Sequence, residues 1–528
     1  MRPQQTVRQT VLLVAGLVLF VTAIRLPLLG IPFERDEGEY AYIGWRLGHN
    51  ELPYRDWVDQ KPPAIFWVYR AALTLPVGPV RAVHLAALLF AAASTCALFF
   101  LARRFMSWFW ALLAAALFSF LSVDPMAQGT AANTELFMLL PLILAQIAFF
   151  KSFAGGRQTR WSFISGALIG IAIAFKQVAA VNWLLVIALF PFFTSPEKRW
   201  RKTISFTACS VAGLLAVICL IACYFWVRGG VSGLIDNVLT HNLEYIGAMT
   251  WSDRFHFCID TLATLARSES IAWVFVVIGF IALVGAQQLK WLMFFAGWLI
   301  TSAIGISASG YFFPHYFQQW LPPLALTATV GAQWLGELRV WRTALIPRVI
   351  FAALLGILPL ITLWPFWFSY SPADAVRRIY PGNFFAEMPS FAERVANITS
   401  ADQRVFIFGA EPEMLFYAQR VSATRYIFLF PLYGPYRNVR EKQLATAKEI
   451  QRAAPPVAVY VPNGLFFNPG SDQYFTEWSL SYLRENFSPD TWLVKETETL
   501  AAIVPAESNM SPPQHLLGAI LVRKASAP

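Results

Sequence analysis

Charged residues are scarce in this chain, and its cysteines are few. Only 14% of the 528 residues are charged, against 57% hydrophobic residues, and this composition is far from that of a soluble domain. The five cysteines lie mostly inside apolar runs and show no metal-ligand spacing, so neither a disulfide framework nor a zinc site is indicated. The sequence instead predicts a polytopic α-helical membrane protein.

Acidic charge is the scarcer sign, since 31 acidic residues stand against 41 basic ones. A net charge of +10 is compatible with nucleic-acid binding, but the basic residues cluster in short loops between apolar runs, where they orient a membrane protein. We therefore expect no nucleic-acid partner. Internal repeats and low-complexity tracts are not obvious either.

Apolar runs follow one another as far as residue 368. Counting them predicts about eleven spans, some shorter than the ~20 residues that a bilayer normally requires. The runs are residues 10–30, 79–101, 106–123, 134–152, 161–175, 178–194, 203–227, 270–287, 291–308, 315–336 and 346–368. Basic residues fall in alternate loops, which the positive-inside rule places in the cytoplasm. The loop after the first run and the C-terminal tail are then expected on the outer, periplasmic side of an inner (plasma) membrane.

Two domains are expected from a change in composition near residue 369. Residues 1–368 form the membrane domain, with an outer loop at 31–78, and residues 369–528 form an extracytoplasmic α/β domain. Strands are predicted at 404–409 and 456–461, and helices near 387–397, 412–420, 440–453 and 475–487. This domain has neither a glycine-rich phosphate loop nor a nucleophile elbow, so we expect it to cap the membrane domain or to help bind an acceptor.

The outer loop holds far more charge than its surroundings. Its densest part runs from Glu34 to Tyr40 and includes Asp36 and Glu37. If a helix starts here, Asp36 and Tyr40 fall on one stripe that faces the protein, whereas Glu37 falls on a stripe of small residues. The alternative interpretation is that the acidic pair merely caps a helix at the membrane surface.

The outer loop closes with the sequence Asp59-Gln60-Lys61-Pro62-Pro63. Because proline favours the first turn of a helix, Lys61 stands just ahead of a helix N-terminus. There its charge adds to the positive end of the helix dipole, an arrangement suited to holding a phosphate. The alternatives are that Lys61 reaches from the membrane surface to water, and that Asp59 only ties the loop together by ion pairs.

These features resemble the C-type glycosyltransferase (GT-C) superfamily. The resemblance rests on the acidic pair Asp36-Glu37 after the first apolar run, on the closing sequence from Asp59 to Pro63, and on many spans followed by an outer soluble domain. More narrowly, the chain is similar to the bacterial branch of aminoarabinose transferases and rhizobial lipopolysaccharide sugar transferases, which is related to protein O-mannosyltransferases. One departure is that Gly38-Glu39 stands where the aminoarabinose transferases carry an arginine.

The resemblance implies that a sugar is transferred, with inversion, from a polyprenyl-phosphate donor on the outer face of the membrane. Asp36 would activate the acceptor hydroxyl, with Glu37 assisting it or holding, together with Asp36, a divalent cation such as Mg²⁺ or Mn²⁺. Lys61 would bind the donor phosphate. Asp59 and Tyr40 would supply a further acidic, metal or acceptor contact. The acceptor would be a lipid, glycan or protein of the cell envelope, such as lipopolysaccharide.

Further candidates for the site lie in later outer segments. Lys176 interrupts an apolar run on the outer side, against the positive-inside trend, and its expected partner is the donor phosphate or Glu135. Glu135 opens the fourth run as a second acidic, metal-binding or acceptor-binding candidate, and a simple helix start explains it equally well. His315 and Tyr316 open a late span and resemble the donor-phosphate segment of the family, although aromatic residues belt most membrane interfaces.

Two other kinds of protein share these sequence features in part. A lipid-linked-sugar flippase or transporter would place its charges near the bilayer midplane at broken helices, whereas this chain concentrates acid in an outer loop. An oligosaccharide ligase, which moves a whole glycan from a lipid pyrophosphate, is the closer alternative to a transferase that moves one sugar.

Overall fold

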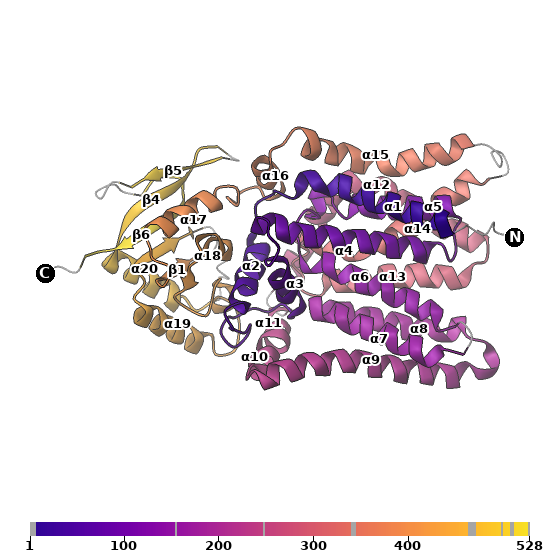
Figure 1. The fold of residues 1–528 in the computed structure, drawn as a ribbon, viewed down its shortest axis with the longest axis horizontal. Helices are drawn as coiled ribbons and strands as arrows, with labels where there is room; N and C mark the ends of the chain where they lie inside the picture. Colours follow the sequence, from indigo (N-terminus) through magenta and orange to yellow (C-terminus); the bar gives the residue numbers. More distant parts are fainter. Residues whose placement is uncertain are drawn as a thin grey trace.

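The chain folds into a helical bundle with a smaller α/β domain at one end (Figure 1). The computed structural model describes residues 7–153, 156–246, 249–338, 345–462, 471–497, 500–506 and 512–525. The first described helix, α1 (Val7–Arg25), begins at the end of the bundle that points away from the α/β domain (Figure 1).

A helix lies at the position of every predicted apolar run. The helices of the bundle are α1 (Val7–Arg25), α4 (Pro79–Ala102), α5 (Trp108–Leu121), α6 (Thr134–Lys151), α7 (Gln158–Phe175), α8 (Val181–Phe193), α9 (Arg199–Val227), α12 (Trp251–Gly285), α13 (Leu289–Ser307), α14 (Leu321–Gly336) and α15 (Leu345–Phe368). Helix α12 differs most from its run, because it begins at Trp251 and not near residue 270. A helix that extends beyond the membrane needs no apolar residues there, so hydropathy alone misses the extension.

Seven helical segments in the described part of the chain are long and apolar enough to cross a membrane. They contain α1, α4, α6, α9, α12, α13 and α15. Shorter helices occupy the other runs, and α5 and α8, with 14 and 13 residues, fall short of the ~20 residues that span a bilayer alone. The predicted class, an α-helical polytopic membrane fold followed by an α/β domain, is confirmed.

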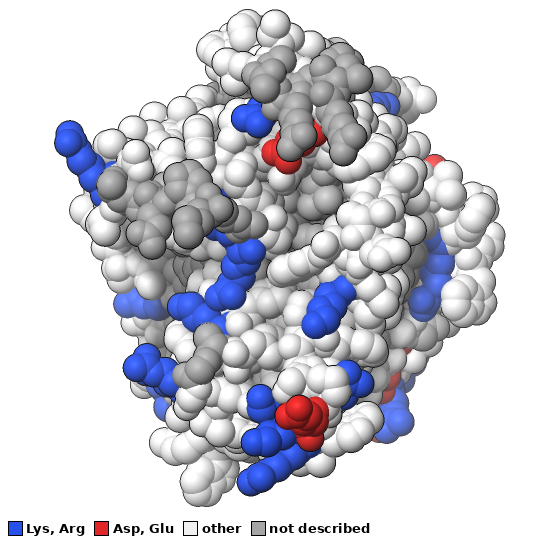
Figure 2. All heavy atoms as spheres, turned by 90° about the vertical axis from the view of Figure 1, so that its right-hand side faces the viewer, with Lys and Arg blue, Asp and Glu red and all other residues white. Residues whose placement is uncertain are grey.

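The end of the bundle opposite to the α/β domain is rich in basic side chains (Figure 2). The loops at this end include Arg103 and Arg104, the segment from Lys198 to Lys202, and Lys290. Acidic side chains are few on the same face (Figure 2). Basic loops that alternate along the sequence therefore share one end of the bundle, as the positive-inside pattern predicted.

Small residues let α7 and α9 pack at close range. A Cβ atom added to Gly166 would lie 1.8 Å from the carbonyl oxygen of Ser210, and one added to Gly213 would lie 2.0 Å from that of Phe163. In a membrane such seams hold helices together by van der Waals contact between backbones. The seam fixes the end of α7, which leads into Lys176.

The outer loop forms two short helices, α2 (Arg35–Leu47) and α3 (Ala64–Ala72), between the bundle and the α/β domain (Figure 1). Helix α2 begins with a capping box. The side chain of Glu34 accepts from the N–H of Glu37, and the side chain of Glu37 accepts from the N–H of Glu34. Helix α3 begins directly after Pro63, as the two prolines predicted.

A six-stranded mixed sheet with the order β2-β1-β3-β6-β4-β5 forms the centre of the α/β domain. Its strands are β1 (Arg404–Phe408), β2 (Val421–Ser422), β3 (Val457–Tyr460), β4 (Phe487–Lys495), β5 (Ala501–Pro505) and β6 (Leu516–Arg523). Its helices are α16 (Pro372–Ile379), α17 (Met388–Asn397), α18 (Pro412–Ala418), α19 (Val439–Ala453) and α20 (Tyr474–Asn486). The predicted strands are the parallel pair β1 and β3. The antiparallel strands β4, β5 and β6 were not predicted. The pairing of β4 with β6 is irregular, with register shifts between Pro489 and Thr491 and between Leu493 and Val494.

The α/β domain packs directly on α2. Gly38 permits this, since a Cβ atom added there would lie 2.2 Å from Cβ of Glu413 in α18. Nearby, the guanidinium of Arg35 donates to the carbonyl oxygen of Ala410 at 2.5 Å and pairs with the carboxylate of Glu411 at 2.9 Å. The residues on either side of the Asp36-Glu37 pair therefore anchor the α/β domain.

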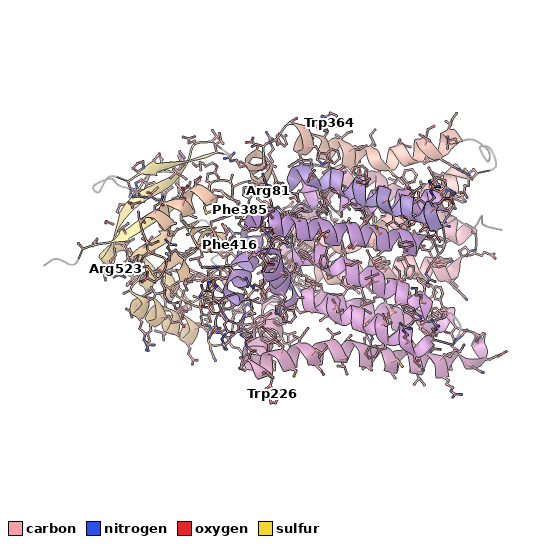
Figure 3. The ribbon with its side chains drawn as sticks, viewed as in Figure 1. Arg81, Trp226, Trp364, Phe385, Phe416 and Arg523 are labelled. Atoms are coloured by element: carbon pink, nitrogen blue, oxygen red, sulfur yellow. The ribbon has the colours of Figure 1, made fainter. Side chains whose placement is uncertain are left out.

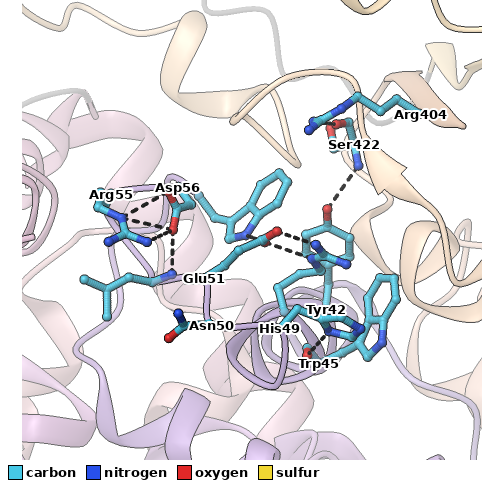
Figure 4. A network of polar contacts seen from close by, with 12 residues as sticks. Tyr42, Trp45, His49, Asn50, Glu51, Arg55, Asp56, Arg404 and Ser422 are labelled. Atoms are coloured by element: carbon cyan, nitrogen blue, oxygen red, sulfur yellow. Dashed lines mark hydrogen bonds and ion pairs between the residues drawn. The ribbon is translucent and has the colours of Figure 1, made fainter. Parts of the chain in front are cut away.

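Polar and aromatic contacts extend this interface. The N–H of Ser422 donates to the hydroxyl of Tyr42 at 3.0 Å (Figure 4), and the N–H of Phe33 donates to the hydroxyl of Tyr417 at 2.9 Å. Phe416 lies at the junction of the two parts (Figure 3), where its ring centre is 5.8 Å from that of Phe33. Helix α2 is thus held by the α/β domain along its first three turns.

Gly38→Ala should weaken the docking of the α/β domain. The added methyl group would collide with the backbone of Glu413 at the start of α18, and overpacking of this kind costs about 1 to 3 kcal/mol. We expect a lower midpoint of thermal unfolding. Gly16→Ala is the matched control, because a methyl group there meets no described atom within 4 Å, and it should leave the midpoint unchanged or higher. An unchanged midpoint for Gly38→Ala would contradict this packing.

Candidate active site

The predicted site residues come from separate parts of the chain and meet where the bundle faces the α/β domain. Asp36 belongs to α2, Lys61 to the turn before α3, and Glu135 to the first turn of α6. Lys176 directly follows α7, and His315 belongs to the short helical segment η6 (Pro314–Trp320). Their separation in the sequence is large, so the packing of the bundle brings them together.

Asp36 stands in the first turn of α2 and is accessible from the site. Its side chain is 26% exposed, and its Oδ1 lies 3.6 Å from Nζ of Lys61. The hydroxyl of Tyr40 donates to Oδ2 at 3.4 Å, so the two residues share one stripe of the helix. Burial alone would raise the pKa of Asp36, but the positive charge of Lys61, together with that of Lys176, outweighs it and holds the pKa below its ordinary value. Asp36 is therefore an ionised carboxylate at neutral pH.

Lys61 lies between two carboxyl groups. Its Nζ is 3.6 Å from Asp36 and 3.5 Å from Glu39, and its side chain is 18% exposed. It also lies 5.3 Å from the ring centre of Tyr40. Burial alone would lower the pKa of Lys61, but Asp36, Tyr40 and Glu39 together raise it well above its usual value. The ammonium group therefore keeps its charge inside the site.

The turn that carries Lys61 is held from several sides. The N–H of Lys61 donates to Oδ1 of Asp59 at 2.7 Å, and the carbonyl oxygen of Lys61 accepts from the hydroxyl of Tyr54 at 2.5 Å. The carbonyl oxygen of Gln60 accepts from the side-chain amide of Asn242 at 2.9 Å. Asp59 is fully buried and thus fixes the turn by a hydrogen bond to the backbone.

Glu39 and Asp59 form a buried pair of carboxyl groups beside Lys61. Both side chains are buried, and Oε1 of Glu39 and Oδ2 of Asp59 have no hydrogen-bond donor among the described residues. Two buried carboxyl groups that share a site do not both stay ionised. Burial first, and the neighbouring Asp59 second, raise the pKa of Glu39 well above its usual value. The pair therefore contributes one negative charge to the site, not two.

Glu37 faces a different part of the protein from its neighbour in the sequence. Its Oε1 accepts from the N–H of Ala132 at 2.7 Å and from Nε2 of His84 at 2.9 Å, and its Oε2 accepts from the N–H of Glu34 at 3.2 Å. Nδ1 of His84 lies 3.0 Å from the carbonyl oxygen of Leu29. Because both partners of His84 are acceptors, both ring nitrogens donate, and an imidazolium pairs with Glu37. This buried ion pair ties α2 to α4 and to the turn before α6.

A second charged cluster lies on the bundle side of the site. Lys176 forms an ion pair with Glu135, and its Nζ lies 3.6 Å from the ring centre of Tyr316. Nε2 of His315 is 4.0 Å from the same carboxylate of Glu135. Lys176 lowers the pKa of Asp36, and Asp36 in turn raises that of His315, so the two clusters face one site.

Asp36 and Glu37, the two carboxylates expected to hold a divalent cation, face different partners. Among the residues that the structure describes, no group of three or more His, Cys, Asp or Glu side chains is arranged to hold a metal ion. Glu37 is already occupied by its own donors, and Asp36 faces the ammonium group of Lys61. Mg²⁺ and Mn²⁺ require several oxygen ligands, whereas here a lysine stands beside the exposed carboxylate.

Two residues of the site carried little or no signal in the sequence. Gln128, in the turn before α6, places its Oε1 2.7 Å from Nδ1 of His315, and its surroundings in the sequence resemble any polar turn. His84 could have been singled out as a lone ionisable residue in an apolar run. Its partner Glu37 could not, since the two residues meet only through the packing of α2 on α4.

The sequence of the chain matches one family model. Residues 60–226 match the model described as dolichyl-phosphate-mannose-protein mannosyltransferase, and this segment includes Lys61, Glu135 and Lys176. A comparison with curated protein sequences finds no match.

Solved structures match almost the whole chain. ArnT from Cupriavidus metallidurans, bound to undecaprenyl phosphate, matches with a TM-score of 0.59 and 14% identity, over 96% of this chain and 100% of that one. AglB, an oligosaccharyltransferase from Archaeoglobus fulgidus in complex with an inhibitory peptide and a dolichol-phosphate, matches with a TM-score of 0.56 and 11% identity, over 98% of this chain and 76% of that one. The mycobacterial arabinofuranosyltransferase AftD matches with a TM-score of 0.54 and 13% identity, over 99% of this chain and 40% of that one.

The chain has the GT-C fold. The resemblance predicted from the sequence is confirmed at the level of the fold, and the chain is a multi-pass membrane protein. Within the GT-C fold, Asp36 and Lys61 occupy the segment between the first and second long helices, and the α/β domain covers that segment (Figure 1).

Glu37→Gln and Asp36→Asn should affect stability differently. Glu37→Gln leaves the buried imidazolium of His84 without its counter-ion, and breaking a buried pair in this way costs about 3 to 5 kcal/mol. Asp36→Asn removes a partly exposed charge, while Lys61 keeps Glu39 as a neighbour. We expect the thermal midpoint in detergent to fall much further for Glu37→Gln. Each variant controls for the other, and equal midpoints would contradict the structural role of Glu37.

Proposed function

We propose that this chain is an inverting glycosyltransferase that moves a sugar from a polyprenyl-phosphate donor to an acceptor hydroxyl. The observation that carries the proposal is the ionised carboxylate of Asp36, 3.6 Å from the charged ammonium group of Lys61 in a partly exposed site. Transfer from a lipid phosphate needs both groups, a carboxylate for the acceptor hydroxyl and positive charge for the departing phosphate. A phosphate is already a stable anion, so no acid has to protonate it.

The other residues support these two. Lys176, His315 and Tyr316 form the bundle side of the donor-phosphate site, and Glu135 holds Lys176 in place. Glu37 is assigned a structural role, since its oxygens are engaged by His84, Ala132 and Glu34.

Tyr40 and Asp59 position the two principal groups. Tyr40 donates to Asp36, and Asp59 fixes the turn of Lys61. Both are therefore expected to act through their neighbours and not on the substrate directly.

The charge of the site favours a monophosphate donor over a lipid pyrophosphate. A pyrophosphate carries additional negative charge, and enzymes usually match such charge with a metal ion or further cations. Here the acid pair of Glu39 and Asp59 stands next to Lys61, so the site adds negative charge where a pyrophosphate would need positive charge. This observation favours a transferase that moves a single sugar over an oligosaccharide ligase. A flippase is disfavoured, because the charges gather at one end of the bundle and not at its middle.

The similar structures indicate the kinds of donor and acceptor. ArnT was solved with undecaprenyl phosphate, and AglB with a dolichol-phosphate and peptides. We propose a polyprenyl phosphate as the carrier and a lipid, glycan or protein of the cell envelope, lipopolysaccharide included, as the acceptor. Because basic loops usually face the cytoplasm, the basic end of the bundle supports the proposal that the site lies on the periplasmic or extracytoplasmic side of the inner membrane.

Asp36→Asn and Lys61→Ala should separate turnover from donor binding. Purified protein would be incubated with a panel of polyprenyl-phosphate sugars while donor consumption is followed. Asp36→Asn should lower kcat by roughly 10²-fold or more, because the acceptor hydroxyl loses its base. Lys61→Ala should raise the donor KM and retain more of the turnover. Lys290→Ala, at the opposite end of the bundle, is the control, and wild-type consumption by both site variants would refute the assignment.

The orientation of the bundle can be tested by cysteine labelling. In a cysteine-free background, Arg437→Cys lies in the α/β domain, where the arginine side chain is 84% exposed. Arg201→Cys lies at the opposite, basic end and is also exposed. A membrane-impermeant maleimide applied to spheroplasts should label the first variant, and should label the second only after permeabilisation. Labelling of Arg201→Cys in sealed spheroplasts would reverse the orientation.

A further inference from the structure

Sugar transfer would change the charge at the donor phosphate. The donor is a phosphodiester with one negative charge, whereas the polyprenyl phosphate left behind is a monoester that carries about two at neutral pH. At the same time the acceptor hydroxyl releases a proton. If the proposed function holds, the site must accommodate one more negative charge and one more proton after transfer than before.

His315 is placed to receive that proton. The ring is buried, and its Nδ1 lies 2.7 Å from Oε1 of Gln128. A carbonyl oxygen only accepts, so Nδ1 carries the ring hydrogen and Nε2 keeps a free lone pair. Nε2 is on the side of the donor-phosphate cluster, 4.0 Å from Oε1 of Glu135.

Charged groups from several elements surround this ring. They are Glu135 of α6, Lys176 after α7, Asp36 of α2 and Lys61 of the turn before α3. Burial is the largest effect on the pKa of His315 and lowers it. The two carboxylates raise this pKa and the two lysines lower it further, so that it lies below its usual value. His315 is therefore neutral in the free protein, and a second negative charge on a bound phosphate would favour its imidazolium form.

The backbone at Gln128, whose side chain contacts His315, is held by its neighbours. Gln128 ends the short segment η2 (Pro125–Ala127) with a left-handed backbone, φ 51°. The next residue, Gly129, donates its N–H to the carbonyl oxygen of Asp124 at 2.8 Å. The carbonyl oxygen of Gly129 accepts from the guanidinium of Arg25, at the end of α1, at 3.3 Å. The main chain that carries the acceptor for Nδ1 is thus held in place by contacts within the protein.

We propose that His315, held by Gln128 with Nε2 free, takes up the proton that transfer releases and becomes the cation that matches the second charge of the product phosphate. The bond between the anomeric carbon and the phosphate oxygen breaks, and its electron pair stays on the phosphate. The acceptor oxygen bonds to the anomeric carbon, and its proton passes to Asp36 and then to Nε2 of His315. Gln128 is a positioning residue for this step.

Proton uptake on ligand binding tests this inference without knowledge of the sugar or the acceptor. The probes are farnesyl phosphate, a monoester, and farnesyl methyl phosphate, a diester. Binding to the full-length protein would be followed by calorimetry at about pH 8 in two buffers of different ionisation enthalpy, where both probes are ionised. Wild-type protein should take up about one proton with the monoester and none with the diester.

Variants assign the proton to His315. His315→Gln should abolish the uptake, because glutamine does not titrate. Gln128→Leu removes the acceptor for Nδ1 and should reduce both the uptake and the affinity for the monoester. Gln128→Glu still accepts from Nδ1 but adds a negative charge, which should charge His315 before the ligand binds. Proton uptake by Gln128→Glu should therefore fall while binding of the monoester is retained. A merely structural role of Gln128 would not separate uptake from binding in this way.

Gln419→Glu is the matched control. Gln419 ends α18 with the same left-handed backbone, φ 51°, and lies exposed on the α/β domain, so this variant should behave as wild type. Equal uptake in wild type and His315→Gln would overturn the inference, as would binding of both probes without uptake. If neither probe bound, the proposed function would fail, and this inference with it.

Discussion

The site depends on keeping one lysine charged among acids. Nζ of Lys61 lies 3.6 Å from Asp36 and 3.5 Å from Glu39, and these neighbours raise its pKa although burial lowers it. A buried ammonium group without such partners would tend to lose its proton. The same lysine keeps Asp36 ionised. The raised pKa values of Glu39 and Asp59 reduce the negative charge around this lysine, because they favour a protonated carboxyl group in the pair.

Helix α2 links three parts of the molecule because successive side chains point in different directions around a helix. Arg35 and Gly38 meet the α/β domain, Glu37 pairs with His84 of α4, and Asp36 is left facing the site. A change at any of these contacts would move Asp36 relative to Lys61. The position of the exposed carboxylate is therefore set by both the bundle and the α/β domain, and this explains why an outer loop needs such a domain over it.

Much of the fold and part of the site could be predicted from local rules. Hydropathy located the helices of the bundle, and the prolines before α3 located its start. A lone lysine at membrane depth needs a partner, and Lys176 does pair with Glu135. The rest depends on contacts between distant segments. In the sequence, Asp36 and Glu37 look like one acidic pair. In the structure, Glu37 accepts hydrogen bonds from His84 and Ala132, and these contacts distinguish its surroundings from those of Asp36.

Glu39 connects the unusual sequence of the loop with the chemistry of the site. By the resemblance, Gly38-Glu39 occupies the region in which aminoarabinose transferases carry an arginine, and here an acid lies beside Lys61. The fixed cations of the site are partly committed, since Lys61 faces Asp36 and Glu39, and Lys176 is paired with Glu135. A site with few fixed cations can bind a singly charged diester but is poorly matched to a doubly charged monoester. A histidine that charges when the monoester forms supplies the missing positive charge at that step, and His315 is the neutral group placed beside these cations.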